Sequence, residues 1–208
     1  MSVIALVGNK GGAGKTTLSV NFAVGLNLQA EVALIDADPQ GSSLQWSKMS
    51  DKQSNVSVYE VQQDLAGQIR DLQNSYQHIV IDCPPYVQSE QTEVVLRLAD
   101  VAVIPVQPSP IDLWATVHIE KAAEEAQKSN PNLEVLLAIN QLELRTTFSR
   151  VMREALSEIK FSVAKSAIRR RAVYRNSVLE GKSVFDMGRA GADAAEELEE
   201  LIKEVLSL

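Results

Sequence analysis

The sequence has only one cysteine, Cys83, among its 208 residues. A single cysteine excludes an internal disulfide and any all-cysteine metal or iron–sulfur site within one chain. The chain also lacks an apolar run long enough to span a bilayer, and its start lacks the basic residues, apolar stretch and cleavage site of a secretion signal. These absences favour a cytosolic protein.

Positive charge is scarce outside one segment of the chain, whose net charge is −7. Residues 1–144 hold 8 Lys/Arg against 17 Asp/Glu, and residues 183–208 hold 2 against 7. Residues 145–182 reverse the balance, with 10 Lys/Arg against 3 Asp/Glu. A basic segment within an acidic protein is a candidate binding site for a polyanion.

Internal repeats, low-complexity tracts and interdomain linkers are also missing. The length lies within the range of one large α/β domain, and a hydrophobic content of 45% is ordinary for a globular core. The sequence therefore predicts a single domain over residues 1–208.

What the sequence does contain is a glycine-rich stretch, KGGAGKTT, at residues 10–17. An expected strand over residues 3–7 runs into it, and an expected helix over about residues 15–28 leaves it. Strand, glycine-rich loop and helix form the setting of a phosphate-binding loop, because backbone N–H groups and the helix N-terminus attract phosphate there.

Two side chains of this loop suit a bound nucleotide. Lys15 can reach the β- and γ-phosphates, and the Thr16 hydroxyl can bind Mg²⁺. The common motif has glycine where this chain has Asn9, and a second lysine, Lys10, precedes the Gly-Gly pair. The loop therefore fits a variant of the phosphate-binding motif.

Carboxylates follow two of the expected strands. The apolar residues 32–35 lead into Asp36 and Asp38, and the apolar residues 78–81 lead into Asp82. Ligands of α/β proteins bind at the carboxyl ends of parallel strands. Asp82 is therefore interpreted as a Walker-B carboxylate that orders the Mg²⁺ shell. A simple loop is the alternative for Asp36 and Asp38.

Two further strands end in residues that could form a site for a nucleotide base. The strand over residues 101–106 opens into a proline turn, in which Pro108 could form a rigid wall. The strand over residues 133–139 ends at Asn140, whose amide carries a donor and an acceptor for an adenine edge. Plain structural turns are the alternative for both.

The remaining elements complete an alternation of strands and helices. They are a short helix over residues 41–48 capped near Ser42 or Ser43, a strand over 57–61, a helix over 64–72, a strand over 162–168 and an acidic amphipathic helix over 190–206. The apolar side of the last helix predicts that it packs on the domain. The pattern predicts an α/β fold with a doubly wound, mostly parallel sheet flanked by helices.

Three motifs together resemble those of the ParA/MinD deviant-Walker ATPases. They are the loop at residues 10–17, Asp36-Ala37-Asp38-Pro39-Gln40, and Val80-Ile81-Asp82-Cys83-Pro84-Pro85. The resemblance covers nearly the whole chain, and the first two motifs together are highly specific. The sequence is similar to short ParA plasmid-partition ATPases without the extra N-terminal DNA-reading domain. It is also similar to McdA-type ATPases, which space carboxysomes.

The resemblance implies a P-loop ATPase that hydrolyses ATP to ADP and phosphate with Mg²⁺. Two monomers would sandwich two ATP molecules, with Lys10 of each reaching into the site of its partner. Carried over by position, the catalytic residues are Lys10, Lys15 and Asp38, and the Mg²⁺ site is formed by Thr16, Asp36 and Asp82. The implied ATP-binding residues are Lys10, Gly11, Gly12, Ala13, Gly14, Lys15, Thr16 and Thr17, with Pro108 and Asn140 beside the base.

The resemblance also implies partners. The ATP-bound homodimer would bind DNA without sequence preference, and an adaptor of the ParB or McdB type would stimulate hydrolysis and release the dimer. The expected location is therefore the nucleoid in the cytoplasm, without a membrane partner, and the cargo is a plasmid or a carboxysome.

The basic segment supplies the candidate DNA contacts. They are Arg145, Arg150, Arg153, Arg169, Arg170 and Arg171. Arginine suits phosphate because its planar fork bonds two oxygens at once. Since no helix-turn-helix or zinc pattern is present, we expect contacts to the DNA backbone that carry no base code.

Two other functions stay open. A MinD-like ATPase that cycles on a membrane would need a basic amphipathic tail, whereas the last helix carries Glu196, Glu197, Glu199 and Glu200. An ATP-dependent ligase of the dethiobiotin-synthetase type shares a similar loop and fold. The Asp38-Pro39-Gln40 sequence and the basic segment disfavour it.

Overall fold

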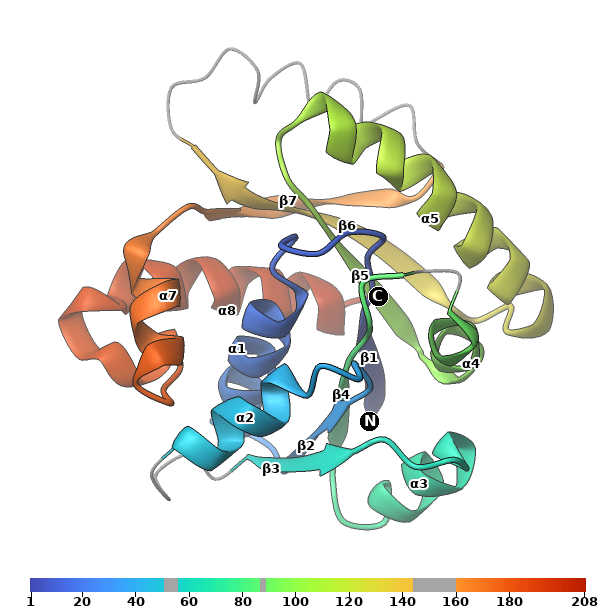
Figure 1. Cartoon of the computed structure of the whole chain (residues 1–208), viewed down its shortest axis with the longest axis horizontal. Coiled ribbons are helices and arrows are strands. Elements are labelled where there is room, and N and C mark those ends of the chain that lie inside the picture. Colours follow the sequence, from blue (N-terminus) through green and yellow to red (C-terminus); the bar gives the residue numbers. More distant parts are fainter. Residues whose placement is uncertain (51–55, 87–88, 144–159) are drawn as a thin grey trace.

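The computed structural model describes residues 1–50, 56–86, 89–143 and 160–208, and its centre is one sheet of seven strands (Figure 1). The strands are β1 (Ser2–Leu6), β2 (Val32–Asp36), β3 (Ser57–Glu60), β4 (His78–Asp82), β5 (Val101–Val106), β6 (Glu134–Leu142) and β7 (Ser162–Arg169). Their order is β3-β2-β4-β1-β5-β6-β7, and each pair of neighbours is parallel. The predicted parallel α/β sheet is confirmed.

Helices cover both faces of the sheet (Figure 1). They are α1 (Lys15–Asn27), α2 (Ser42–Met49), α3 (Leu65–Leu72), α4 (Glu90–Leu98), α5 (Pro110–Ser129), α7 (Ala172–Leu179), the 3₁₀ helix η1 (Val184–Ala190) and α8 (Ala192–Leu206). Buried side chains of α3, α4 and α5 share one core cluster with the sheet, and those of α1, α2, α7, η1 and α8 share the other. This two-sided cover makes the sheet doubly wound.

The central strands are apolar along their whole length because both of their faces are covered. Alternate residues of β1 serve the two cores: Val3 and Ala5 pack on the side of α3 to α5, and Ile4 and Leu6 pack on the side of α1 and α8. Strands buried on both faces are expected to be continuously apolar rather than alternating. This explains why these strands could be predicted from their apolar runs.

The topology brings the predicted carboxylates together. β4 lies between β2 and β1, and the strand register sets Asp82 beside Asp36 on one side and Leu6 on the other. The glycine-rich loop follows β1 at the same edge of the sheet. The chain places β2 and β4 on one side of β1 and β5 on the other, so the strand order reverses here. Open α/β sheets bind ligands at such a switch point.

The acidic helix α8 packs on the sheet, as predicted. Leu198, Leu201, Ile202 and Val205 are all buried in the core shared with α1. Among the described residues, no helix combines the length and the apolar character that crossing a membrane requires.

Three boundaries differ from the sequence-based expectation. The helix α2 is not capped by a serine side chain: its N-cap is Gly41 in the left-handed conformation, with φ 64°. Strand β6 continues past Ile139 to Leu142 because it pairs with β7 as far as Arg169. Helix α8 begins after Ala190, because that residue ends η1 and Gly191 separates the two helices.

Candidate nucleotide-binding site

The glycine-rich loop has backbone angles that only glycine adopts easily. Gly12 and Gly14 have φ values of 81° and 92°, and Gly14 forms the N-cap of α1. A Cβ added to Gly14 would lie 2.4 Å from Asn140 Nδ2, which leaves no room for a side chain. The loop thus ends in a helix N-terminus without a capping side chain, where backbone N–H groups are available to an anion.

Three side-chain amides fasten the loop to the ends of β5 and β6. Gln107 Nε2 and Gln141 Nε2 donate to the Gly12 carbonyl at 2.7 and 3.1 Å, and Asn140 Nδ2 donates to the Ala13 carbonyl at 2.7 Å. In a trans peptide the C=O and the next N–H point in opposite directions. Because the Gly12 and Ala13 carbonyls point toward the ends of β5 and β6, the N–H groups of the residues that follow them point away from these strands.

Gln141 reaches the loop from an uncommon backbone conformation. Its φ is 57°, and it is the one non-glycine residue with positive φ in the described part of the chain. Such residues are rare and are often found where function requires a special geometry. Here the conformation accompanies a side chain directed at the phosphate-binding loop.

Lys15 is held inside the loop. The residue is 7% exposed, and its Nζ donates to the Lys10 carbonyl at 3.1 Å. Burial lowers the pKa of Lys15, and the nearby Asp82 carboxylate opposes this change. A Cβ on Gly8 would lie 3.3 Å from Lys15 Cδ, so the glycine leaves room for the lysine stem. Lys10 itself lies on the surface.

Asp82 is enclosed by hydroxyl groups. It has no exposed surface, and its two oxygens accept hydrogen bonds from Ser19 Oγ at 3.1 Å and Ser43 Oγ at 2.7 Å. Burial raises the pKa of Asp82 to about 6, although hydrogen bonds from Ser43, Thr16 and Ser19 lower it. The contact with Thr16 joins the Walker-B carboxylate to the loop residue predicted to bind Mg²⁺.

Asp36 and Asp38 have different surroundings. Asp36 is 2% exposed and accepts the backbone N–H groups of Asp38, at 3.2 Å, and Leu44, at 2.9 Å. Burial raises its pKa, and these N–H groups lower it. Asp38 is half-buried and accepts the N–H of Gln40 at 2.9 Å. Asp36 therefore shapes the backbone that carries Asp38.

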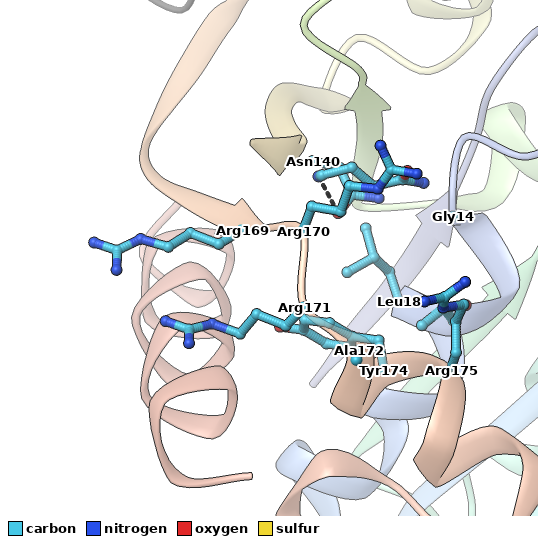
Figure 2. A pocket seen from close by; sticks show the side chains of 11 residues that line it. Gly14, Leu18, Asn140, Arg169, Arg170, Arg171, Ala172, Tyr174 and Arg175 are labelled. Carbon is cyan, nitrogen blue, oxygen red and sulfur yellow. Dashed lines mark hydrogen bonds between the residues drawn. The ribbon is translucent and has the colours of Figure 1, made fainter. Parts of the chain in front are cut away.

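A cavity of about 410 Å³ adjoins the loop (Figure 2). It is lined by Gly14, Thr17, Leu18, Asn140, Gln141, Arg169, Arg170, Arg171, Ala172, Tyr174 and Arg175. This volume lies in the range of small-molecule sites, whose lower end is roughly 300 Å³. Because the cavity begins at the last glycine of the loop, it is placed to hold the base of a nucleotide whose phosphates lie on the loop.

Three of the four arginines that line the cavity, Arg169, Arg170 and Arg171, form ion pairs with acidic residues. Figure 2 shows Arg169 and Arg171 extending away from the cavity toward α8. Arg171 forms ion pairs with Glu197 at 2.8 Å and Asp193 at 3.0 Å, and Arg169 pairs with Glu197 at 3.4 Å. These ion pairs join the end of β7 to the acidic helix.

Arg170 takes a different direction from its two neighbours. It pairs with Glu143 at 2.6 Å, at the end of β6. Three arginines predicted to bind DNA therefore lie beside the nucleotide cavity and within ion pairs, and their contact with DNA stays a prediction. Arg145, Arg150 and Arg153 lie outside the described residues.

The other predicted site residues gather at the carboxyl edge of the sheet. The loop, Asp36, Asp38, Asp82 and Asn140 all lie there. Among the described residues that line the cavity, Asn140 is present and Pro108 is not. One amide proton and the Oδ1 of Asn140 are used, by Ala13 and Gln141, so part of its hydrogen-bonding capacity is left for a base.

The residues present fit Mg²⁺ and a nucleoside triphosphate. Within the described ranges, no group of three or more His, Cys, Asp or Glu side chains could form a metal cage by itself. Mg²⁺ in nucleotide sites ordinarily takes one or two carboxylates together with substrate phosphates, and Asp82 with Thr16 matches that pattern. The glycine cradle and the buried Lys15 match the phosphates.

Sequence reasoning missed four polar residues of the site. Gln107 and Gln141 follow apolar strands in the same way as Asn140, so the same signal could have found them. Ser19 and Ser43 carry no local signal, because their contacts with Asp82 depend on how α1 and α2 pack over β4.

Comparison with known proteins agrees with this geometry. The family model of the CobQ/CobB/MinD/ParA nucleotide binding domain matches residues 4–206. Maintenance of carboxysome distribution protein A from Halothiobacillus neapolitanus is 38% identical over 206 residues, which cover 98% of this chain and 95% of that protein.

Solved structures support the fold. Apo McdA of Cyanothece superposes with a TM-score of 0.79 at 16% identity, covering 99% of both chains. A variant of Cyanothece McdA in complex with ATP superposes with a TM-score of 0.73 at 17% identity, covering 100% of this chain and 97% of that one. With the family model matching nearly its whole length, the chain belongs to the CobQ/CobB/MinD/ParA nucleotide-binding family, as its ParA/MinD-type motifs predicted.

Proposed function

We propose that this chain is an ATPase that hydrolyses ATP to ADP and phosphate and uses its nucleotide state to position carboxysomes. The observation that carries the proposal is the 38% identity to the carboxysome distribution protein of H. neapolitanus over 98% of this chain. This similarity favours a carboxysome over a plasmid as the cargo. A loop built for phosphates beside a cavity sized for a base supports the ATPase activity.

The side chains divide the chemistry among them. Lys15 binds the β- and γ-phosphates, and Thr16 with Asp82 holds the Mg²⁺ shell. When bound, Mg²⁺ would neutralise negative charge on the phosphoryl group that is transferred. Asp38 orients the attacking water, and Lys10 of the partner completes the cationic clamp. Asp36 supports Asp38 through the backbone contact at 3.2 Å, and its predicted place near the metal stays a proposal.

Dimerisation, DNA binding and an adaptor complete the proposed cycle. The ATP-bound homodimer binds nucleoid DNA without sequence preference in the cytoplasm, and an adaptor of the McdB type stimulates hydrolysis and releases the dimer. Arg169 and Arg170 support the DNA contact because their side chains are 46% and 66% exposed despite their ion pairs. Doubling the contacts in a dimer would link DNA affinity to ATP.

The proposal is tested in two steps. The purified chain with Mg²⁺ and ATP should turn over ATP faster when non-specific DNA and the product of the neighbouring gene are both added. In the source cells, deleting the gene should cluster carboxysomes while plasmid retention stays unchanged. Evenly spaced carboxysomes in the deletion strain, or loss of plasmids instead, would contradict the proposed cargo.

A further inference from the structure

Ser43 is a buried serine whose hydroxyl points at a carboxylate instead of capping its own helix. It is the second residue of α2, and its Oγ donates to Asp82 Oδ2 at 2.7 Å, with neither side chain exposed. A serine at the N-cap accepts a hydrogen bond from first-turn N–H groups, but the N-cap of α2 is Gly41, and Ser43 lies two residues after it. In α2, Asp36 Oδ2 accepts the N–H of Leu44 at 2.9 Å.

The start of α2 is therefore held by two carboxylates on neighbouring strands. Asp36 ends β2 and Asp82 ends β4, and the strand register sets them side by side. Asp36 also fixes the backbone N–H of Asp38. Ser43 follows on the same stretch of chain, so a rotation of the Asp82 carboxylate must either move α2 or break the hydrogen bond with Ser43.

Ser19 offers a matched comparison on another helix. Its Oγ lies 3.1 Å from Asp82 Oδ1 and 3.0 Å from the Lys15 carbonyl, so its one proton is shared between two acceptors. Ser19 belongs to α1, whereas Ser43 belongs to α2. The two serines thus hold the same carboxylate but join it to different elements.

The middle of α2 carries a tryptophan that can report on movement of the helix. Trp46 is 2% exposed, and its Nε1 donates to the Lys182 carbonyl at 3.1 Å. It lies one helical turn beyond Ser43, and the chain has only one other tryptophan, Trp114. A displacement of α2 would change the surroundings of the Trp46 indole and hence its emission.

We propose that Ser43 is a positioning residue that orients the Asp82 carboxylate and ties it to the α2 backbone following Asp38. The inference rests on the proposed ATPase site, in which Asp82 belongs to the Mg²⁺ shell. In this proposal Ser43 acts through its hydrogen bond with Asp82. It makes the position of α2, and with it the segment that carries Asp38, respond to the ligand state of Asp82.

The test uses a Trp114→Phe parent, in which Trp46 is the only tryptophan. Binding of ATP is measured with and without Mg²⁺, and the emission of Trp46 is recorded in both conditions. In the Ser43→Ala variant, ATP binding without Mg²⁺ should equal that of the parent. The variant should need about tenfold more Mg²⁺ for half-maximal binding, because it loses a hydrogen bond to a charged group. The emission change on adding Mg²⁺ and ATP should disappear.

Three variants serve as controls. Ser42→Ala, next to Ser43 but exposed, should behave as the parent. Ser19→Ala should raise the Mg²⁺ requirement but keep the emission change, because α2 stays joined to Asp82. Ser43→Cys fills the same space with a weak donor, so it should match Ser43→Ala and exclude a cavity as the cause.

The outcomes separate this inference from the proposed function. A parent that binds no ATP in the presence of Mg²⁺ would overturn both. A parent that binds, beside a Ser43→Ala variant with the same Mg²⁺ requirement and emission change, would overturn the role of Ser43 alone. A parent without an emission change, or a Ser19→Ala variant that loses it equally, would overturn the tie to α2.

Discussion

At the scale of single residues, Asp82 is a fully buried carboxylate at the edge of the candidate site. Burial raises its pKa to about 6 from the ordinary 3.8, so the folded protein holds this proton more tightly than the unfolded chain does. The resulting stabilisation is fully present below pH 3.8 and is lost as the pH rises through about 6. At neutral pH, the nucleotide-free protein therefore carries a buried charge that its hydroxyl partners offset only in part.

Replacing Asp82 with asparagine should show how much the buried charge destabilises the folded protein. The amide oxygen of Asp82→Asn can still accept from one of the two serines, and its NH2 group can donate to the hydroxyl oxygen of the other, but the charge is gone. Without nucleotide, the variant should be more stable than the parent by ~1–3 kcal/mol at about pH 8, and the difference should vanish at about pH 4. Chemical unfolding at both pH values measures it. A variant less stable than the parent at the higher pH would contradict the direction of the pKa change.

At the scale of elements, the segment between β7 and α7 divides its arginines between two tasks. Arg171 has 25% of its side chain exposed and pairs with Asp193 and with Glu197, which is 15% exposed. Arg170 is 66% exposed and pairs with Glu143, which is 54% exposed. Exposed ion pairs contribute little to stability, whereas removing one partner of a more buried pair is costly because it leaves the other charge uncompensated. Arg171 therefore serves the packing of α8, and Arg170 is the better candidate for DNA.

Two single replacements test this division. Arg171→Ala should lower the free energy of unfolding by about 1–2 kcal/mol and leave the salt dependence of DNA binding unchanged. Arg170→Ala should leave stability within about 0.5 kcal/mol and reduce the slope of log affinity against log salt by about 0.9 for each DNA phosphate that the variant no longer neutralises. DNA binding is measured at saturating ATP, because Arg170 also lines the nucleotide cavity. An unchanged slope in Arg170→Ala would locate the DNA-binding surface elsewhere.

Elements with a clear local sequence pattern could be predicted, and elements whose contacts lie elsewhere in the chain could not. The strands β1, β2, β4, β5 and β6 are continuous apolar runs, because both faces of a parallel sheet are covered. The helix α7 and the 3₁₀ helix η1 are short and were not predicted. The start of α2 could not be predicted either, since the group that accepts the N–H of Leu44, in its first turn, belongs to Asp36, on a strand.

The same limit applies to the candidate site. The glycine-rich loop and the strand-end carboxylates are local patterns, so Lys15, Asp36 and Asp82 could be predicted to share one edge of the sheet. Contacts that cross between elements, such as Ser43 with Asp82, require the strand order that sets β4 between β2 and β1. The role of polar residues outside a motif can be predicted only once that strand order is known.

At the scale of the whole molecule, part of the positive charge in residues 145–182 is neutralised by acidic side chains of the same chain. The acidic helix α8 neutralises arginines of the basic segment through Asp193 and Glu197. The field that a monomer presents to DNA is thus weaker than the count of 10 Lys/Arg in residues 145–182 suggests. This favours binding by a dimer, in which two such surfaces act together.

The two lysines of the loop should separate monomer and dimer functions. Lys15 is buried in its own loop, whereas Lys10 lies on the surface. Lys15→Ala should weaken nucleotide binding by the monomer strongly, because it removes the clamp on the phosphates of its own site. Lys10→Ala should weaken ATP-dependent dimerisation and turnover with a smaller effect on monomer binding. Titration of a fluorescent ATP analogue at concentrations below dimerisation compares them, and equal losses would leave the trans role of Lys10 unsupported.

The mass of the Asp38→Ala variant in the presence of Mg²⁺ with ATP or with ADP tests the proposed nucleotide-switched dimer most directly. Asp38 is half-buried at the edge of the site, and its proposed role is confined to the attacking water. The variant should therefore bind ATP, sediment at twice the monomer mass with ATP and at the monomer mass with ADP, and lose nearly all turnover. A variant that stays monomeric with ATP, or that hydrolyses ATP as fast as the parent, would contradict it.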